Sequence, residues 1–403
     1  RLRRSFLMRV PLLPVLSLLL IGVLIDCYIY RRMRHTGVSR GWCWTYVVVA
    51  TLVSLGLMAV AFMPKKDAGD KELTWLMWSL FVYLSVYVPK IVLALFMFVQ
   101  QLSGRIMHRR LRGLGIAGGI VSGVILCTLW WGALISRFDI DVEEVTVPVG
   151  GLPAGYDGYR IVQISDIHTG TFGGDTHFVE KLVGKVNELH PDLIVFTGDI
   201  VNRHSAELIP FTGVLSGLSA PDGVWSIMGN HDYGDYYAWS TPSAKQDDVD
   251  RLQAMQASMG WRMLNNAHTV LRRGDNDSIV LVGVENIGDP PFTVYGDLSE
   301  AYPALGDPSV KILLSHNPAH WDAEVAGDKS VNIALTLSGH THAMQVELFG
   351  KSPAAMRYDK WGGLYTDSLG RHLYVNIGAG EVGMPARIGA TPEITLITLK
   401  PAL

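Results

Sequence analysis

The segment Ile161-Val162-Gln163-Ile164-Ser165-Asp166-Ile167-His168 joins a short apolar run to two polar residues that can bind a metal ion. The apolar part has the length and composition of a buried β-strand, so Asp166 and His168 come directly after its carboxyl end. The same arrangement recurs after strands predicted at 193–197, 224–228, 310–315 and 333–338. Those strands are followed by Gly198-Asp199, Gly229-Asn230-His231-Asp232, His316-Asn317 and Gly339-His340-Thr341-His342.

Segments with helical spacing separate several of these strands, which predicts a layered α/β domain with a central sheet. In such sheets, sites form at the carboxyl edge, so we expect the five polar sets to meet there. Valines at alternate positions predict a linker strand within 138–157. We therefore divide the chain into a domain over 1–137, this linker strand and a catalytic domain over 158–403. The predicted helices cover 178–189, 207–218 and 247–259, and further strands cover 279–284, 373–377 and 394–399.

The residue types at these strand ends indicate a metal centre. Asp, Asn and His supply oxygen and nitrogen ligands, a set that suits Mn, Fe or Zn better than Mg²⁺. The three cysteines, Cys27, Cys43 and Cys127, all lie in or beside the N-terminal apolar stretches, so the catalytic domain has no thiolate ligand. Seven donors can hold two ions if one carboxylate bridges them. A single His or Gly-Asp after a strand is usually structural, and only the ordered set favours a metal site.

These five motif blocks together resemble the calcineurin-like metallophosphoesterase superfamily over about residues 158–400. The resemblance implies an αββα fold. The stretches 315–318, 340–345 and 374–398 are similar to the branch of membrane-associated or exported bacterial phosphohydrolases, some of which cleave the pyrophosphate of UDP-diacylglucosamine. A common version of the last motif has Gly-Gly before the Gln, where this chain has Ala343-Met344. The substrate therefore does not follow from the resemblance.

The resemblance also implies a role for each motif residue. Asp166, His168 and His342 would hold a first divalent metal, Asn230, His316 and His340 a second, and Asp199 would bridge them. A metal-bridging hydroxide would attack phosphorus, and His231, oriented by Asp232, would protonate the leaving group. Arg387 and Gln345 are further candidates for contact with the substrate. The glycines at 198, 229 and 339 are expected to permit tight backbone turns beside the metals.

Four apolar stretches fill the first third of the chain, at 11–30, 44–63, 75–100 and 116–136. Each is near the length that crosses a bilayer as a helix, and Trp and Tyr gather at their ends. The mean hydropathy of the whole chain is +0.23, which is high for a soluble enzyme. We therefore predict a bundle of four transmembrane helices in an integral, multi-pass protein. The resemblance to bacterial phosphohydrolases implies that the membrane is the bacterial inner membrane.

The distribution of arginines predicts which side of the membrane carries the catalytic domain. The loop after stretch one and the loop before stretch four are both rich in arginine, which places them in the cytoplasm and the catalytic domain outside it. Three arginines near the N-terminus argue the other way, but Met8 would be a sensible start, which removes them. The loop after stretch one carries Arg31, Arg32, Arg34 and Arg40, and the loop before stretch four carries Arg105, Arg109, Arg110 and Arg112. The three N-terminal arginines are Arg1, Arg3 and Arg4.

Two details inside the membrane stretches predict how the helices pack. Lys90 and Asp26 lie at similar depths in stretches that run in the same direction, so we expect them to form a buried ion pair. The pair either fixes the bundle or serves transport or substrate binding. Gly115, Gly119 and Gly123 share one helix face, which predicts close packing there.

The leading hypothesis is a membrane-anchored two-metal phosphohydrolase acting on a phosphoester or pyrophosphate, with a phospholipid or lipid-linked substrate in the bilayer. The alternatives are a soluble substrate, a catalytically silent metal-binding scaffold, and a transporter or sensor. The net charge of −3 gives no sign of a nucleic-acid partner. The sequence does not determine the oligomeric state.

Overall fold

The computed structural model describes residues 12–61, 70–106, 111–274, 276–288 and 293–402. The chain forms two compact units, Arg1–Leu134 with Gly383–Ala386, and Ile135–Val382 with Arg387–Leu403. Several residues used in the sequence argument lie outside the described part, and the orientation predicted from them stays a prediction. These are Arg1, Arg3, Arg4, Met8, Pro11, Met63, Arg109 and Arg110.

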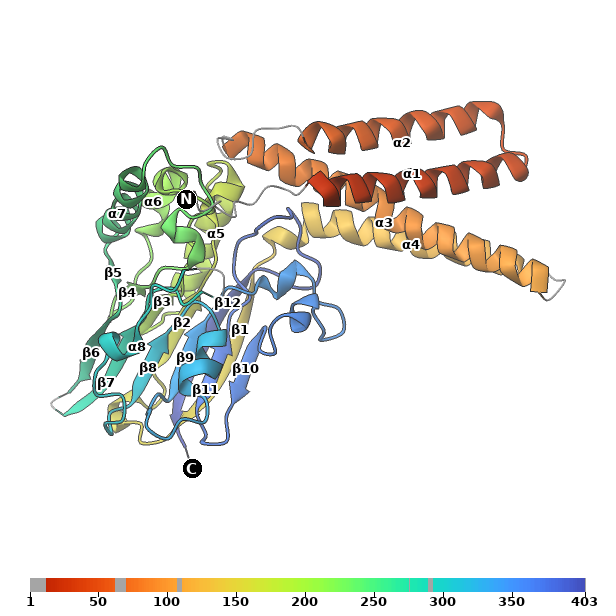
Figure 1. Cartoon of the computed structure of the whole chain (residues 1–403). Helices are drawn as coiled ribbons and strands as arrows, with labels where there is room; N and C mark the ends of the chain where they lie inside the picture. The colour runs from red at the N-terminus through yellow and green to blue at the C-terminus, as the bar shows by residue number, and fades with distance from the viewer. Residues whose placement is uncertain (1–11, 62–69, 107–110, 275, 289–292, 403) are drawn as a thin grey trace, which may run out of the picture. The chain divides into compact units, whose positions relative to one another are not determined.

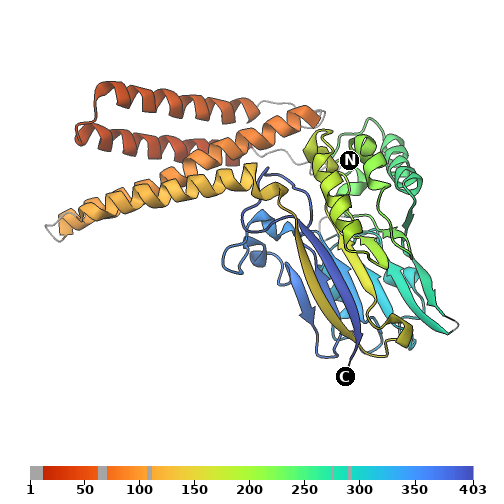
Figure 2. The same cartoon turned by 180° about the vertical axis from the view of Figure 1, so that it is seen from behind.

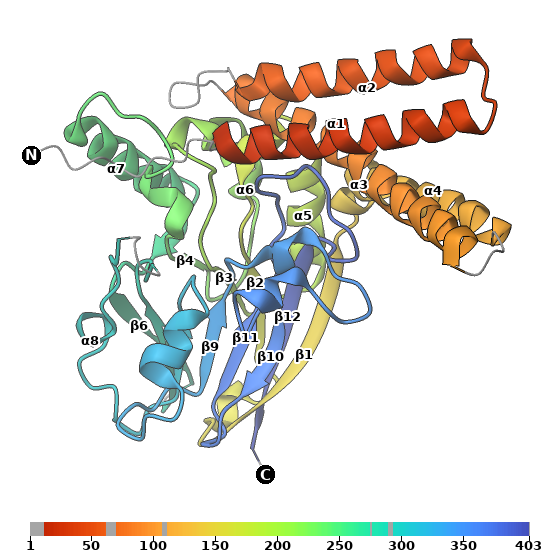
Figure 3. The same cartoon turned by 45° about the vertical axis from the view of Figure 1, so that its right-hand side comes forward.

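The second unit is built on two six-stranded mixed sheets, with strand orders β1-β12-β2-β3-β4-β5 and β10-β11-β9-β8-β7-β6. Figure 3 shows the strands of both sheets running alongside one another. The first sheet consists of β1 (Asp141–Val149), β2 (Arg160–Ile164), β3 (Leu193–Phe196), β4 (Val224–Ser226), β5 (Trp261–Met263) and β12 (Glu393–Pro401). The second consists of β6 (Ala267–Arg273), β7 (Asp277–Gly283), β8 (Lys311–Leu314), β9 (Leu335–Ser338), β10 (Gly363–Thr366) and β11 (His372–Val375).

Alternation along the strands divides the core into layers. In β3, Leu193 and Val195 pack between the two sheets, whereas Ile194 and Phe196 pack against the helices outside the first sheet. A third cluster covers the outer face of the second sheet, where Leu313 packs with α8 (Leu298–Ala301) and Trp321. The predicted αββα arrangement is confirmed. The helices outside the first sheet are α5 (His177–Glu188), α6 (Thr212–Leu215) and α7 (Pro242–Ser258) (Figures 1 and 2).

The predicted elements differ from the observed ones in three places. The segment predicted as a linker strand contains β1, which pairs in parallel with all nine residues of β12 and forms the edge of the first sheet. The helix predicted over 207–218 is a 3-10 helix, Ser205–Phe211, followed by α6, because Pro210 has no N–H for a helical hydrogen bond. Strands β5, β6 and β10 were not predicted, because each has exposed or half-buried residues along its length and none has a continuous apolar run.

The first unit contains four long helices, and all four are apolar and long enough to cross a membrane. They lie where the four membrane stretches were predicted. Helix α3 is the longest, with 37 residues, and it continues through Pro89. The helices are α1 (Leu12–His35), α2 (Arg40–Ala61), α3 (Asp70–Ile106) and α4 (Arg112–Leu134).

The predicted ion pair between Asp26 and Lys90 is confirmed, with Lys90 Nζ 2.9 Å from Asp26 Oδ1. Two tyrosines complete the hydrogen bonding of the carboxylate: Tyr46 OH donates to Oδ1 (2.5 Å) and Tyr87 OH donates to Oδ2 (2.6 Å). The Lys90 ammonium also lies 4.8 Å and 4.5 Å from the ring centres of Tyr46 and Tyr87. Charges inside a membrane are costly unless paired, and this pair has partners from three helices.

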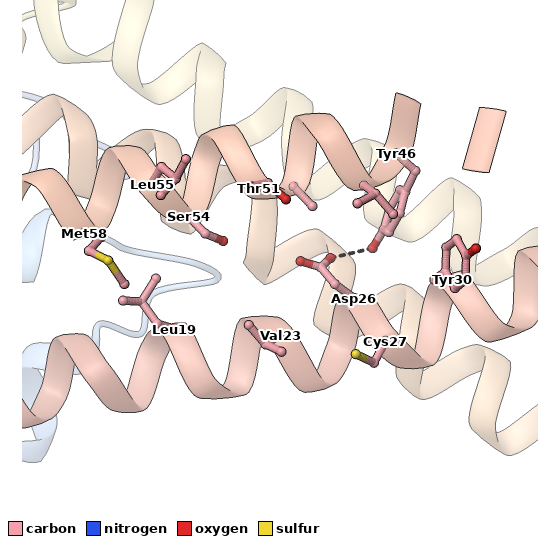
Figure 4. A pocket seen from close by; sticks show the side chains of 12 residues that line it. Leu19, Val23, Asp26, Cys27, Tyr30, Tyr46, Thr51, Ser54, Leu55 and Met58 are labelled. Atoms are coloured by element: carbon pink, nitrogen blue, oxygen red, sulfur yellow. Dashed lines mark hydrogen bonds between the residues drawn. The ribbon is translucent and has the colours of Figure 1, made fainter. Parts of the chain in front are cut away.

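Asp26 and Tyr46 also line a mostly apolar cavity of about 420 Å³ between α1 and α2 (Figure 4). In the view of Figure 4, their side chains point toward one another across the two helices.

The predicted glycine face of α4 is only partly correct. A Cβ added at Gly115 would touch the side chain of Gln100, but one added at Gly119 or Gly123 would meet no described atom within 4 Å. The close approach to α3 occurs instead at Gly118, where an added Cβ would lie 2.5 Å from Phe96 Cβ. On the same side of α4, Ser122 Oγ donates to the carbonyl oxygen of Pro89 (2.9 Å). The face that packs therefore follows 115, 118 and 122.

Replacing Gly118 with Val should destabilise the helical unit by about 1–3 kcal/mol, because the new side chain forces α3 and α4 apart. Gly119→Val is the matched control, since it makes the same change to helix propensity one residue away. Thermal unfolding of both variants in detergent, followed by circular dichroism, checks the difference. Equal midpoints for the two variants would contradict this account of the helix packing.

Candidate metal centre

The polar residues that follow β2, β3, β4, β8 and β9 all meet at one edge of the two packed sheets. The first three strands belong to one sheet and the last two belong to the other. Each strand is parallel to its sequence neighbour within its sheet, so the carboxyl ends lie on the same side. Two groups of ligand-type side chains result, each with its ligand atoms within 4.8 Å of one another. The groups are Asp166, His168 and His342, and Asp199, His316 and His340.

In the first group, the His342 Nε2 atom lies 3.2 Å from Asp166 Oδ1 and 3.0 Å from His168 Nε2. In the second, His316 Nε2 lies 3.2 Å from Asp199 Oδ2 and 3.3 Å from His340 Nδ1. These separations, between atoms that all carry lone pairs, suit ligands that surround a common cation.

Asp199 and Asn230 complete the arrangement. The Oδ2 atom of Asp199 lies 3.2 Å from His316 Nε2 in its own group and 3.6 Å from His168 Nε2 in the other. Asn230 Oδ1 lies 3.1 Å from His316 Nε2. The side-chain N–H₂ of Asn230 donates to Tyr236 OH (2.9 Å), which turns its oxygen toward the second group. One carboxylate oxygen is therefore placed between the two sets of ligands.

Two further features show that these residues fit metal ions. The Oδ1 atom of Asp166 is buried and accepts no hydrogen bond in the described structure, so it has a lone pair directed at the first group. Five of the residues in the two groups also have a left-handed backbone: Asp166, His168, Asp199, His340 and His342 have φ between 49° and 76°. Such strain in non-glycine residues persists only where the surrounding structure imposes it, and it is concentrated at functional sites.

The glycines beside these residues act mainly through close approach. A Cβ at Gly339 would lie 2.0 Å from Ser165 Oγ and 2.3 Å from Asp166 Oδ2. A Cβ at Gly229 would lie 2.2 Å from Asp199 Oδ1. Gly198 combines both requirements, because its φ is +100° and its Cβ position is 2.5 Å from the backbone nitrogen of Gly229. A tight turn was predicted at all three glycines, but of these only Gly198 has a positive φ.

Burial and neighbouring charges set the protonation of these groups. Burial raises the pKa of Asp199, but the neighbouring His316 and His231 outweigh it, and the pKa is well below its usual range. Burial lowers the pKa of His168 strongly, and burial together with His316 lowers that of His340 to about 3. Burial would lower the pKa of His316 as well, but Asp199 raises it to about 9. The carboxylate is therefore charged, and His168 and His340 are neutral, as cation ligands must be, whereas His316 carries a proton beside Asp199 that a bound cation would have to displace.

His231 lies at the edge of the two groups, and its side chain is half-buried. Its backbone N–H donates to Asp199 Oδ1 (2.8 Å), and its Nδ1 lies 2.7 Å from the carbonyl oxygen of Asn202. Its ring stacks on Tyr236, with the ring centres 4.2 Å apart. The ring is thus held by Asn202 and Tyr236, which leaves Nε2 available to a ligand.

Asp232 is buried beside the ligand groups and contacts backbone N–H groups. Its carboxylate accepts hydrogen bonds from backbone N–H groups at 2.8–3.3 Å, and none of the described bonds joins it to the His231 ring. The orientation of His231 by Asp232 therefore stays a prediction, without a direct bond in the described structure to support it. Its donors are Asp199, Ile200, Val201 and Gly229. Burial and the nearby Asp199 raise the pKa of Asp232 to about 7.

Arg387 and Gln345 are buried rather than exposed to a substrate. Arg387 donates to the carbonyl oxygens of Gly380 and Ile377, and its Nη2 lies 3.3 Å from His342 Nδ1. Gln345 Oε1 accepts a hydrogen bond from the backbone N–H of Val382 (2.8 Å). Both side chains support the loops around the first group, so their expected contact with substrate has no basis in the structure.

Sequence reasoning missed three residues that touch the site. Tyr236 and Asn202 hold His231, and Tyr358 OH lies 2.9 Å from His340 Nε2. Asn202 contributes only its backbone carbonyl, which leaves no signal in the sequence. Tyr236 and Tyr358 lie in irregular loops, where no periodicity predicts the direction of a side chain. Their proximity to predicted ligands along the chain was the only available signal.

Comparison with known proteins adds two family matches. Residues 159–344 match the family model described as calcineurin-like phosphoesterase. Residues 8–137 match a model described as a probable calcineurin-like phosphoesterase transmembrane domain. The two matches cover the catalytic motifs and all four long helices.

Curated relatives extend this likeness over nearly the whole chain. A transmembrane protein with metallophosphoesterase domain from Danio rerio is 31% identical over 99% of this chain and 91% of its own length. The uncharacterized metallophosphoesterase YkuE of Bacillus subtilis is 32% identical over 73% of this chain and 98% of its own length. The UDP-2,3-diacylglucosamine pyrophosphatase LpxG of Chlamydia muridarum is 29% identical over 69% of this chain and 94% of its own length.

Asp232→Asn should lower the free energy of unfolding by about 1–3 kcal/mol, because an amide nitrogen replaces one oxygen that accepts buried backbone N–H groups. Asp235→Asn is the control, since the Asp235 side chain is 40% exposed and pairs with Lys245 at the surface. Urea unfolding of both variants measures the difference. Similar midpoints would contradict the role assigned to the Asp232 carboxylate.

Proposed function

The chain belongs to the calcineurin-like phosphoesterase family, and we propose that it hydrolyses a phosphoester or pyrophosphate bond with two metal ions held between its two sheets. Family membership makes it a metal-dependent phosphoesterase, and the match of its helices to a transmembrane domain makes it a membrane protein. The position of Asp199 Oδ2 between the two ligand groups carries the proposal, because it is where a bridging carboxylate must lie.

The proposed ligands follow the two groups. Asp166, His168 and His342 would hold one ion, and Asn230, His316 and His340 would hold the other, with Asp199 shared. This mixed oxygen and nitrogen set suits Mn, Fe or Zn. When bound, the two ions would polarise the phosphate oxygens and lower the pKa of a bound water.

His231 is the proposed general acid. Its Nδ1 lies against the Asn202 carbonyl oxygen, which fixes the orientation of the ring and leaves Nε2 to deliver a proton to the leaving oxygen. The half-buried position at the edge of the ligand groups lets the ring reach a substrate without being a ligand itself. Asp232 would act on this reaction only indirectly, by holding the loop that carries Asp199.

A lipid or lipid-linked substrate is the class that we favour. The four helices confine the enzyme to a bilayer, and confinement raises the effective concentration of substrates in the same membrane. The similarity to a UDP-2,3-diacylglucosamine pyrophosphatase supports the same class. A soluble phosphoester remains the alternative within the same chemistry.

We also propose that the catalytic unit, as predicted over 158–403, lies on the extracytoplasmic side of a bacterial inner membrane. The short loop between α1 and α2 and its flanks carry Arg31, Arg32, Arg34 and Arg40, and such basic loops stay in the cytoplasm. If the loop between α3 and α4 is also cytoplasmic, α4 crosses the membrane and ends on the outer side. The domain that follows α4 would then be outside the cytoplasm.

Asp199→Asn should reduce hydrolysis of bis-p-nitrophenyl phosphate by at least about 10–100-fold, the loss that is typical when a residue supporting a metal site is replaced. The variant should also bind less metal. Metal analysis of the purified wild type should give about two Mn, Fe or Zn per chain, as a two-metal site requires. Asp157→Asn is the control, because Asp157 is paired with Lys400 near the opposite end of β2. No bound metal and no turnover with Mn²⁺, Zn²⁺ or Fe²⁺ would favour the catalytically silent scaffold or sensor.

His231→Gln should slow hydrolysis by about 10²–10⁴-fold for esters with poor, alkyl leaving groups, because these need a proton. The loss should be much smaller for p-nitrophenyl esters, whose leaving group departs as an anion. Comparing kcat for the two ester types in wild type and variant checks this. An equal loss for both would remove His231 from the role of general acid.

A further inference from the structure

Four large apolar side chains are exposed in the short segment that follows the His340-Thr341-His342 ligands. We name residues 344–356 the apolar loop. Within it, Met344 is 44% exposed, Leu348 52%, Met356 85% and Phe349 101%. These are large apolar surfaces for so short a segment of a folded domain, and exposed apolar patches mark sites of interaction.

Both ends of the apolar loop are attached to the metal centre. Met344 comes two residues after His342, which belongs to the first ligand group. At the other end, Tyr358 OH lies 2.9 Å from Nε2 of His340, a member of the second group. Any molecule that covers the loop therefore reaches the rim of the site.

The structure holds the apolar loop in one conformation. Leu348 and Lys351 form an antiparallel bridge, with backbone hydrogen bonds of 2.9 and 3.1 Å in the two directions. The N–H of Glu347 donates to the carbonyl oxygen of Ile388 (2.8 Å), and Ser352 Oγ donates to the carbonyl oxygen of Ala343. The exposure of Phe349 is thus the result of a defined hairpin.

The backbone of the loop is strained at apolar residues. Phe349 occupies the first tip position with φ of 56°, followed by Gly350 at 71°, a turn in which Asn or Gly is strongly preferred. Ala343 and Met344 have φ of 49° and 46°, where a common form of the motif has two glycines. A left-handed backbone is unfavourable for residues other than glycine, because the Cβ atom comes too close to the following carbonyl oxygen. The chain therefore retains an exposed Phe and Met at positions where they are unfavourable for folding.

We propose that the apolar loop inserts its Leu348-Phe349 tip into the acyl region of the bilayer and so places the catalytic site at the lipid surface. This inference rests on the proposed function, since it assigns a lipid substrate class to the same site. Exposed Lys351 pairs with Leu348 at the base of the tip, and a basic residue beside an apolar tip can bind lipid phosphates.

The chain itself favours a lipid surface over a protein partner. The last membrane span ends at Phe138 and β1 begins at Asp141. Only Asp139 and Ile140 lie between them, and this connection spans about 10 Å when extended, so the catalytic unit is tethered close to the bilayer surface. A unit confined in this way meets lipid at a far higher effective concentration than it meets a soluble protein partner.

A labelling experiment on the full-length chain in phospholipid vesicles tests the insertion directly. Cys27, Cys43 and Cys127 are replaced by Ala, and a single cysteine is introduced by Phe349→Cys for an environment-sensitive fluorophore. Leu369→Cys is the matched control, because Leu369 is 44% exposed in the turn before β11, at the opposite end from the metal centre. Nitroxide-labelled lipids should quench the label at position 349 and leave that at 369 unaffected. Equal quenching at the two positions would overturn the proposal, as would no quenching at 349, which would indicate a protein partner instead.

A kinetic experiment tests the consequence for the substrate. Leu348→Ser combined with Phe349→Ser should raise KM for a phospholipid phosphoester presented in vesicles at least about tenfold, because the loss of just one of the two buried apolar side chains is expected to have that effect. Hydrolysis of soluble bis-p-nitrophenyl phosphate should stay unchanged. An unchanged KM for the vesicle substrate would overturn the proposal. Absence of turnover in the wild type would count against the proposed function alone, because the quenching experiment requires no catalysis.

Discussion

The Asp232 carboxylate accepts hydrogen bonds from four backbone N–H groups, and the metal centre depends on this interaction. Three donors, Asp199, Ile200 and Val201, follow β3, and the fourth, Gly229, follows β4. The buried charge thus holds two loops in one conformation, and an unsatisfied buried carboxylate would be far costlier. With the loop so fixed, Asp199 Oδ2 can lie 3.2 Å from His316 and 3.6 Å from His168.

The second requirement is that two sheets deliver their strand ends to one place. Asp166, Asp199 and Asn230 come from the first sheet, and His316 and His340 come from the second. The apolar layer between the sheets sets their separation, and the close approach at Gly198, Gly229 and Gly339 lets the loops meet without a side chain in between. Packing elsewhere in the domain therefore offsets the left-handed backbone of five ligand residues.

In the helical unit, charged side chains also need partners, because the surroundings there are lipid rather than water. Asp26 and Lys90 would be costly within membrane spans, but Tyr46, Tyr87 and the pair itself satisfy them, so the network ties α1, α2 and α3 together. The structural role that we considered for this pair accounts for all of these contacts. The contribution to catalysis that we propose for the membrane lies instead in the apolar loop, which follows the His340 and His342 ligands in the chain.

The sequence by itself determined the ligand types, their order after apolar strands, the four membrane helices and the Asp26–Lys90 pair, because these follow from local composition, periodicity and depth. Tertiary structure decided which groups meet. The sheet position of β1, the partners of Asp232 and the burial of Arg387 depend on segments far apart in the chain. The support of His231 by the Tyr236 ring and by the carbonyl of Asn202 also depends on how the chain folds. No local pattern encodes such contacts, because a backbone N–H or carbonyl has the same chemistry at nearly every residue, and only folding selects the one that faces a given side chain.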